Sequence, residues 1–323
     1  MAVGDPMTNA PINLADQILT VSSWQPDDEF PIFPVGSKPK RAIYSPEGGA
    51  FPFVVPKHRY LFKISTGRRI FQHWSEVVAY KVAVLLGLSA APCHIAVDDK
   101  EGTVGVAVEF FYGHPGTVAP RFVAGSDIMK RAIRGYDEKT GRQHNVITNI
   151  RAADVYKVPD AARFWGATFA FDALIGNTDR HPENWGFLAA FDSRGQRPSL
   201  SFAPLFDHGT SFGYELDETR LGVLSRPDRL KSYILRGRHH VRWNMQDQKP
   251  ALHADLCRRL VEEFPVARVE VARIAEFPLH EISNALSMCT KLRLPEGELS
   301  QERAEMMYNL LVLRQQNLLR ALG

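Results

Sequence analysis

Three polar side chains with the chemistry of phosphoryl transfer each follow an apolar segment of the chain. Asp179 and Asn184 lie five positions apart in the polar turn NTDRHPENWGFL, and Asp207 follows a second apolar run, a predicted strand from Phe202 to Phe206. One carboxylate can accept the proton of an attacking hydroxyl, while an amide and a second carboxylate hold the divalent metal that bridges the phosphates. The stretch from Phe169 to Gly213 therefore favours phosphoryl transfer with ATP and Mg²⁺.

Other chemistry is compatible with the same residue types. Two imidazoles and two carboxylates of this stretch form a mixed set that often binds metals, which makes a metal-dependent hydrolase one alternative. The four residues are Asp179, His181, Asp207 and His208. A hydrolase of this kind would need no nucleotide and would give no role to the basic residues described next. A small-molecule or lipid kinase is a nearer alternative, and a non-catalytic binding module is a third.

A candidate phosphate loop lies upstream, in the sequence PVGSKPKRAIY. A glycine lets backbone N–H groups approach an anion closely, and nearby lysines add positive charge. The loop residues are Gly36, Ser37, Lys38 and Lys40, of which Gly36 and Lys40 match the pattern G-x-x-x-K. A solvated basic turn has the same composition, so the pattern alone does not separate the two interpretations.

Lys63 lies in the middle of a predicted strand, His58 to Ser65. Apolar and polar residues alternate there, so Lys63 points away from the face that carries Phe62 and Ile64. A lysine flanked by apolar residues needs a partner for its charge, unless it lies on an exposed edge strand, where lysines block pairing with other chains.

The partner that we expect for Lys63 is Glu76, in a helix predicted over Trp74 to Leu88. Ser75 is the predicted N-cap and Gly87 ends the helix, which puts Glu76 in the first turn. Glu76 can favour the helix dipole there, or it can pair with Lys63, the arrangement by which kinases place the phosphates.

A break in the pattern follows the N-terminal strands. Ala91 to Val97 and Thr103 to Tyr112 predict a hairpin, and the Gly- and Pro-containing segment Gly113 to Pro120 comes next. We expect a lobe boundary in this segment. The backbone of Glu109 to Phe111 is then, by its position, the hinge that would bind adenine.

Helical periodicity dominates the rest of the chain. The predicted helices include Asp160 to Ile175, which delivers the polar turn, and Gln301 to Leu322 at the end. The predicted fold class is α+β, with a small sheet-rich N-lobe in residues 1–113 and a larger helical C-lobe in residues 114–323.

The order of these motifs resembles the HipA-like serine/threonine kinases, which are distantly related to the phosphatidylinositol kinases. That family carries a T-D-x-H-x-x-N catalytic loop, a P-L-[YF]-D metal-binding segment and a phosphate loop that ends G-x-x-x-K. The matching residues are Thr178, Asp179, His181 and Asn184; Pro204, Leu205, Phe206 and Asp207; and Gly36 and Lys40. The resemblance implies a bilobal protein-kinase-like fold and runs from about Phe30 to at least Gly213.

The resemblance also implies a role for each matched residue. Asp179 orients or deprotonates the acceptor hydroxyl, His181 orders the catalytic loop, and Asn184 and Asp207 hold Mg²⁺. Lys63, positioned by Glu76, binds phosphate, and the loop from Gly36 to Lys40 closes over the triphosphate. In the family this loop can be autophosphorylated, and Ser37 is the candidate here, since a phosphate would add negative charge beside the triphosphate.

The partners follow from the resemblance alone. It implies a toxin of a toxin–antitoxin pair, with a protein substrate such as a translation factor or an aminoacyl-tRNA synthetase and a small antitoxin protein. We expect a compact version of the kinase core, without the extra N-terminal region of longer family members.

Composition limits the remaining possibilities. The chain has 323 residues, of which 45% are apolar and 23% charged, as in ordinary globular proteins. The net charge of +3 does not imply a nucleic-acid partner, although Ser225 to Trp243 interleaves basic and aromatic residues as an RNA-binding segment would. Three dispersed cysteines, no secretory signal and no long apolar run predict a cytoplasmic protein without a membrane anchor.

Overall fold

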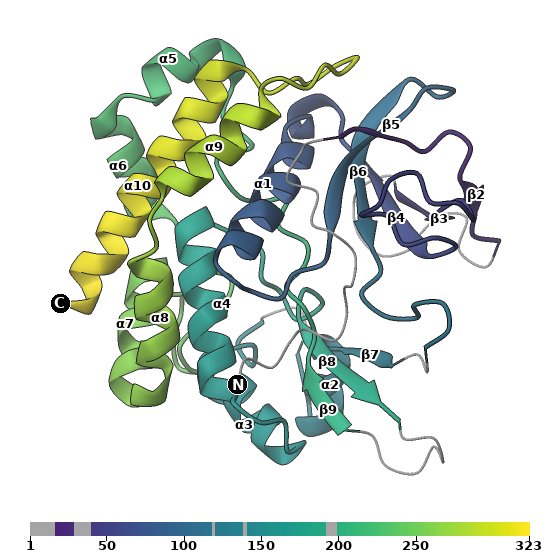
Figure 1. The fold of residues 1–323 in the computed structure, drawn as a ribbon. Helices are drawn as coiled ribbons and strands as arrows, with labels where there is room; N and C mark the ends of the chain where they lie inside the picture. The colour runs from purple at the N-terminus through teal and green to yellow at the C-terminus, as the bar shows by residue number, and fades with distance from the viewer. Residues whose placement is uncertain (1–16, 29–39, 118–119, 138–140, 192–198) are drawn as a thin grey trace.

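The N-terminal part of the protein is built around a six-stranded sheet, seen on the right of Figure 1. The computed structural model describes residues 17–28, 40–117, 120–137, 141–191 and 199–323. The strand order is β1-β5-β6-β4-β3-β2; β1 and β5 are parallel and the other neighbours antiparallel. The strands are β1 Leu19–Thr20, β2 Gln25–Pro26, β3 Lys40–Tyr44, β4 Arg59–Ile64, β5 Cys93–Asp98 and β6 Thr103–Glu109.

The two faces of this sheet bury different side chains. Tyr60 and Phe62 of β4 lie on one face in a cluster that includes Trp24 and Ile43. Val106 of β6 lies on the other face, in the larger core that also contains helix α1, Gln72–Leu85. Because successive strand residues alternate between faces, Lys63 shares the α1 face rather than that of Phe62. The predicted orientation of Lys63 is confirmed.

Helix α1 begins earlier than predicted. It starts at Gln72 after Phe71, and the N–H of Ser75 donates to the carbonyl of Phe71 within the helix. The prediction of Ser75 as N-cap is therefore wrong, and its hydroxyl instead donates to the carbonyl of Ser211 at 2.8 Å. Glu76 lies beyond the first turn, so the helix dipole does not account for it.

A second, three-stranded sheet lies below the first in Figure 1 and flanks the predicted catalytic loop. Its order is β7-β8-β9, with β7 Arg121–Ala124, β8 Gly186–Ala190 and β9 Ser199–Phe202. The strand predicted from Phe202 to Phe206 is thus misplaced, since β9 ends where it was expected to begin. Leu205 makes only an isolated bridge to Ala90, and the chain reaches Asp207 in an irregular segment.

Helices make up most of the C-terminal part, and α4 is their centre. The helices are α2 Gly125–Ala132, α3 Val146–Val155, α4 Ala161–Ile175, α5 Leu221–Leu224, α6 Pro227–Arg236, α7 His253–Glu263, α8 Arg268–Ala275, α9 His280–Cys289 and α10 Gln301–Leu322. Helix α4 packs against α7, α8 and α10 and is buried along most of its length. It ends at Gly176, whose φ of 72° suits glycine, and the polar turn follows directly.

The predicted α+β fold with a sheet-rich N-lobe and a helical C-lobe is confirmed. The lobe boundary at residues 113 and 114 stays a prediction. Within the described ranges, every helix is too short or too polar to serve as a membrane span.

The basic segment from Ser225 to Trp243 combines an exposed helix with a partly buried end. Its first half forms α6, and Val241 and Trp243 are buried. The ring of Trp243 is covered by the guanidinium of Arg259, 4.6 Å from its centroid, so it is not available to stack on a base.

Candidate active site

Lys63 lies between two carboxylates that come from distant parts of the chain. Its Nζ is 2.8 Å from Oε1 of Glu76 on α1 and 2.8 Å from Oδ1 of Asp207. Burial alone would lower the pKa of Lys63, but the attraction of Asp207 and Glu76 outweighs it and holds the pKa above its ordinary value. The ammonium therefore stays charged although the side chain is buried.

Glu76 holds the predicted metal-binding segment as well as Lys63. Its second carboxylate oxygen, Oε2, accepts a hydrogen bond from the N–H of His208 at 2.8 Å. Asp207 itself has a φ of 58°, a left-handed conformation that is uncommon for a residue other than glycine. The hydrogen bond from the N–H of His208 to Glu76 fixes the backbone that follows Asp207. The ion pair with Lys63 fixes the side chain of Asp207, so its carboxylate has a defined orientation.

The catalytic loop is held by bonds within the loop and to the next segment. The side-chain oxygen of Asn177 accepts from the N–H of Asp179 at 3.1 Å and from the hydroxyl of Thr210 at 2.9 Å. The amide nitrogen of Asn184 donates to the carbonyl of Asp179 at 2.7 Å. Since this bond uses the nitrogen of Asn184, the side-chain oxygen is the atom that Asn184 can offer to a metal.

Arg180, which the sequence analysis did not identify, bridges the turn that carries Asp179 and Asn184 and the segment that leads to Asp207. Its Nη1 donates to the carbonyl of Asn184 at 3.0 Å and to the carbonyl of Phe206 at 2.9 Å. One guanidinium therefore fixes the backbone of the residue before Asp207 and that of the predicted ligand Asn184. The family motif gives no signal for Arg180, because it occupies the unspecified position between Asp179 and His181.

Asp172 on α4 compensates the charge of Arg180. It binds the guanidinium through both oxygens and also accepts from Nε2 of His239 at 2.9 Å. Burial would raise the pKa of Asp172, but the charge of Arg180 and the bond from His239 hold it well below its ordinary value. A carboxylate on an otherwise apolar helix was the one sequence signal for this residue.

The predicted residues converge on a cleft of about 260 Å³. The cleft is lined by Lys40, Lys63, Arg69, Gln72, Asp179, His181, Asp207, Gly209, Thr210 and Tyr214. Lys40 is paired directly opposite Lys63 in the β3–β4 ladder, which puts both lysines on the same face. Three cations and two carboxylates thus surround one space, with Arg69 the cation that the sequence did not predict.

Not every predicted residue lines this cleft. Asn184 is 4% exposed and contributes to the loop rather than to the cleft wall. Gly36, Ser37 and Lys38 lie outside the described residues. His181 lines the cleft, and its Nδ1 accepts from the N–H of Glu183 at 3.2 Å.

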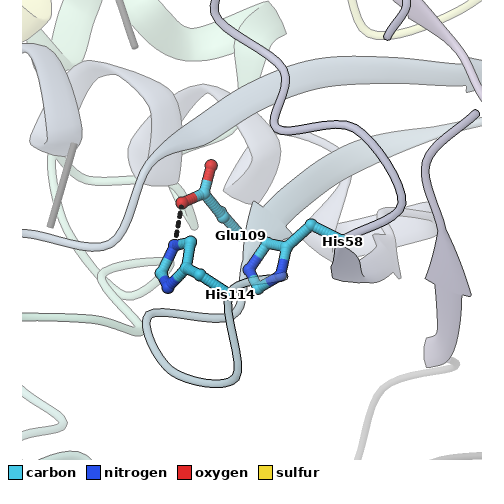
Figure 2. Close-up of side chains that lie close together, drawn as sticks. All are labelled: His58, Glu109 and His114. Carbon is cyan, nitrogen blue, oxygen red and sulfur yellow. Dashed lines mark hydrogen bonds and ion pairs between the residues drawn. The ribbon is translucent and has the colours of Figure 1, made fainter. Parts of the chain in front are cut away.

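The predicted hinge is already bonded within the protein at two of its N–H groups. The N–H of Glu109 donates to the carbonyl of Pro92, and that of Phe110 donates to the carbonyl of Arg59. The side chain of Glu109 is buried and bonded to His114, as Figure 2 shows, and the ring of Phe111 packs against that of Phe206. A ligand at this hinge would therefore meet the backbone of Phe111, not the Glu109 side chain.

The geometry does not fit the metal hydrolase considered from sequence. His208 is buried, its Nδ1 lies 3.2 Å from Nη2 of Arg180, and it does not line the cleft. Burial, followed by the charge of Arg180, lowers the pKa of His208 to about 3. Within the part of the chain that the structure describes, the four hydrolase candidates do not form a group with metal-ligand spacing.

Mg²⁺ fits the donors that remain at the cleft. Asp207 is 36% exposed toward solvent at its side chain, and Asp179 lines the same space. Carboxylate oxygens are ligands that Mg²⁺ prefers, but of the two predicted metal ligands only Asp207 lines the cleft, since Asn184 is buried within the loop.

A larger hollow of about 510 Å³ lies over α6 and the end of α10. Its wall includes Thr178, the neighbour of Asp179, and the arginines Arg236, Arg238, Arg314 and Arg320. It contains neither Lys63 nor Asp207, so the predicted site residues lie in the smaller cleft.

Comparisons with known proteins identify the family of the chain. Residues 35–271 match the family model of the HipA-like C-terminal domain. A segment of 102 residues is 35% identical to the serine/threonine-protein kinase CtkA of Helicobacter pylori strain J99, and it spans 30% of this chain and 30% of that protein.

The fold is similar to the crystal structure of a Helicobacter pylori proinflammatory kinase, CtkA. The TM-score is 0.70 at 19% identity, over 94% of this chain and 98% of that one. HipA of Shewanella oneidensis MR-1, in its complex with HipB and operator DNA, aligns with a TM-score of 0.49 at 14% identity, over 91% of this chain and 67% of that one.

Proposed function

Because the chain belongs to the HipA-like C-terminal domain family, we propose that it is an ATP- and Mg²⁺-dependent kinase that phosphorylates serine or threonine on a protein. The observation that carries the proposal is the position of Lys63 between Glu76 and Asp207. A strand lysine held by a helix glutamate beside a metal-binding aspartate is the arrangement with which kinases hold ATP. A metal hydrolase would give Lys63 and Glu76 no role, whereas a small-molecule or lipid kinase would use the same three residues and differ only in its acceptor.

Each cleft residue has a separate role in the proposed phosphoryl transfer. Lys63, Lys40 and Arg69 contact the phosphates, and the N–H of Phe111 donates to adenine. Asp207 and Asn184 hold Mg²⁺, which when bound neutralises charge on the β- and γ-phosphates. Since transfer involves little covalent chemistry by the protein, these positions and charges supply most of the rate enhancement.

Asp179 acts on the acceptor rather than on the nucleotide. Its carboxylate lines the cleft and its backbone is fixed through Asn177 and Asn184. It orients the acceptor hydroxyl and takes its proton as the bond to phosphorus forms. His181 keeps the loop in place.

The proposal extends to partners through family membership. A translation factor or an aminoacyl-tRNA synthetase is the first acceptor to try, and a small antitoxin protein is the first partner. Ser37 is the residue to examine for autophosphorylation. Cys93 and Cys257 are buried and form no disulfide, which supports a reducing compartment such as the cytoplasm.

The test is incubation of purified protein with γ-labelled ATP and Mg²⁺, beside the Asp179→Asn variant, with phosphosites located by mass spectrometry. We expect label on the wild type alone, with ATP affinity nearly unchanged in the variant. Asp207→Ala should instead weaken Mg²⁺-dependent ATP binding. Absence of ATP binding to the wild type would sink the kinase proposal, and ATP binding without protein labelling would indicate a small-molecule or lipid acceptor.

A further inference from the structure

Three potential metal ligands converge at the predicted hinge, away from the cleft residues that line the candidate active site. His58 precedes β4, Glu109 is the last residue of β6, and His114 lies in the loop that follows. Each offers a ligand atom, and these atoms lie within 4.8 Å of one another. Figure 2 shows the three side chains close together, with a hydrogen bond between His114 and Glu109.

The hydrogen bonds of His58 fix which ring nitrogen is free. Its Nε2 is 2.6 Å from the carbonyl of Phe110, and because a carbonyl can only accept, Nε2 carries the proton. With the proton on Nε2, Nδ1 is the ring nitrogen that offers a lone pair. This ring is 1% exposed, and Nδ1 is buried without a hydrogen-bond partner among the described residues.

A buried acceptor that receives no hydrogen bond costs free energy, and a bound cation would remove that cost. The bond from Nε2 to a backbone carbonyl is also the contact that orients a histidine whose other nitrogen binds a metal. The tautomer of His58 therefore leaves Nδ1 as the nitrogen that can bind a metal.

Glu109 is also buried, and a bound cation would compensate the charge of its carboxylate. It is 2% exposed, and the described part of the chain gives it no lysine or arginine ion pair. Oε2 accepts from the hydroxyl of Tyr60 at 2.9 Å, and Oε1 lies 3.1 Å from Nε2 of His114. A buried carboxylate with only a phenol and an imidazole as partners is poorly compensated, since neither carries a fixed positive charge.

We propose that His58, Glu109 and His114 form a Zn²⁺ site with a fourth position open to water. Two imidazoles and one carboxylate are a common zinc donor set, and Tyr60 and the Phe110 carbonyl supply the outer hydrogen bonds that such sites use. The site joins the start of β4, the end of β6 and the loop after it.

One local adjustment completes the site. The rings of His58 and His114 are stacked, with centroids 4.3 Å apart and planes within 13°. Parallel rings do not aim their lone pairs at one point, so the ring of His114 must turn when the metal binds. Its loop contains Gly113 and Gly116, both at a φ of 76°, and His114 is partly exposed, so the turn displaces no core side chain.

The experiment is zinc binding to chelator-stripped protein in the absence of ATP, so its result does not depend on the kinase proposal. We expect one Zn²⁺ per chain in a competition titration, a rise in Tm with added Zn²⁺, and X-ray absorption that shows nitrogen and oxygen ligands without sulfur. Glu109→Gln and His114→Ala should each weaken binding by more than about 100-fold, because outer-shell partners alone are worth about 10–100-fold.

His280→Ala is the matched control, because His280 is exposed on α9 and outside the cluster; it should bind zinc as the wild type does. Glu109→Gln preserves the side-chain shape, so it keeps the test valid if His114→Ala folds poorly. Failure of the wild type to bind stoichiometric Zn²⁺ would overturn the proposal. So would binding that survives both cluster substitutions, because the ion would then lie elsewhere.

Discussion

Arg180 and Asp172 form a two-bond ion pair with no solvent exposure of either side chain. Nη2 is 2.6 Å from Oδ1 and Nε is 2.9 Å from Oδ2. Through Nη1, the same guanidinium holds the carbonyls of Asn184 and Phe206. The pair therefore anchors both loops of the candidate active site to helix α4, so the loops share one support.

Asp172→Asn should destabilise the protein by about 3–5 kcal/mol, because it leaves the Arg180 charge buried without its counterion. Urea denaturation of the wild type and the variant measures this loss. The matched control is Glu262→Gln, which breaks the solvent-exposed pair between Arg258 and Glu262 on α7. That control should cost no more than about 0.5 kcal/mol. Equal losses in both variants would contradict a special role for the buried pair.

Lys63→Met should lower kcat/KM for phosphoryl transfer by about 10²–10³-fold, the usual effect of removing one electrostatic contact to the reacting group. ATP affinity should fall too, since Lys63 meets the phosphates before transfer. Lys100→Met, at an exposed lysine in the β5–β6 turn, is the control for loss of one positive charge and should match the wild type. Nearly normal transfer by Lys63→Met would remove Lys63 from the phosphate site.

The sequence analysis identified the charged residues that line the cleft, but it missed the buried pair of Arg180 and Asp172 that holds the loops carrying them. Lys63 could be found because a lysine in an alternating strand is unusual, and Asp179 and Asp207 because each follows an apolar run in a motif of known order. Their convergence is a tertiary property: Asp207 is 144 positions from Lys63. Motif order, not local periodicity, made the three residues recognisable as one site.

The misses have local physical causes. Ser75 is a good N-cap residue, but the helix begins at Gln72, where packing rather than a side-chain cap sets the start. Phe202 to Phe206 has the composition of a strand, yet its second half serves to lead the chain into the left-handed Asp207. Arg180 lies in a turn where an exposed arginine would be ordinary, and only its buried partner Asp172 shows its role.

The unfolding free energy should fall as pH falls from about 6.5 to about 4. Burial lowers the pKa of His73 to about 4 and of His94 and His208 to about 3, whereas the unfolded chain titrates near 6.5. In this window the unfolded state binds more protons, so acid favours it. Each histidine contributes about 1.4 kcal/mol per pH unit, or about 4 kcal/mol per unit for the three.

Denaturation curves measured across this pH range provide the check. His94→Phe should lower the slope by about 1.4 kcal/mol per pH unit, and a phenyl ring suits the site because His94 lies against the rings of Phe53 and Tyr80. His280→Gln, at an exposed histidine, should leave the slope unchanged. A slope that is the same in His94→Phe would show that His94 is protonated equally in both states.

Gly176→Ala should destabilise the protein and displace the catalytic loop. A Cβ at this residue would overlap the guanidinium of Arg314, in addition to the strain of a φ of 72°. Arg314 is itself buried and donates to the carbonyl of Ile175 at 2.8 Å, so it cannot withdraw without losing that bond. Gly102→Ala is the matched control, because its φ is 62° and nothing lies within 4 Å of the added carbon.

The two variants share the backbone strain, which costs about 1 kcal/mol. The difference between their unfolding free energies therefore measures the contact with Arg314, and we expect Gly176→Ala to be worse by about 1–3 kcal/mol. Gly176 also precedes the loop that carries Asp179, so labelling by ATP should fall in Gly176→Ala and not in Gly102→Ala. Equal unfolding free energies of the two variants would mean that Arg314 moves aside without cost. Equal labelling of the two variants would mean that the end of α4 does not position the predicted catalytic loop.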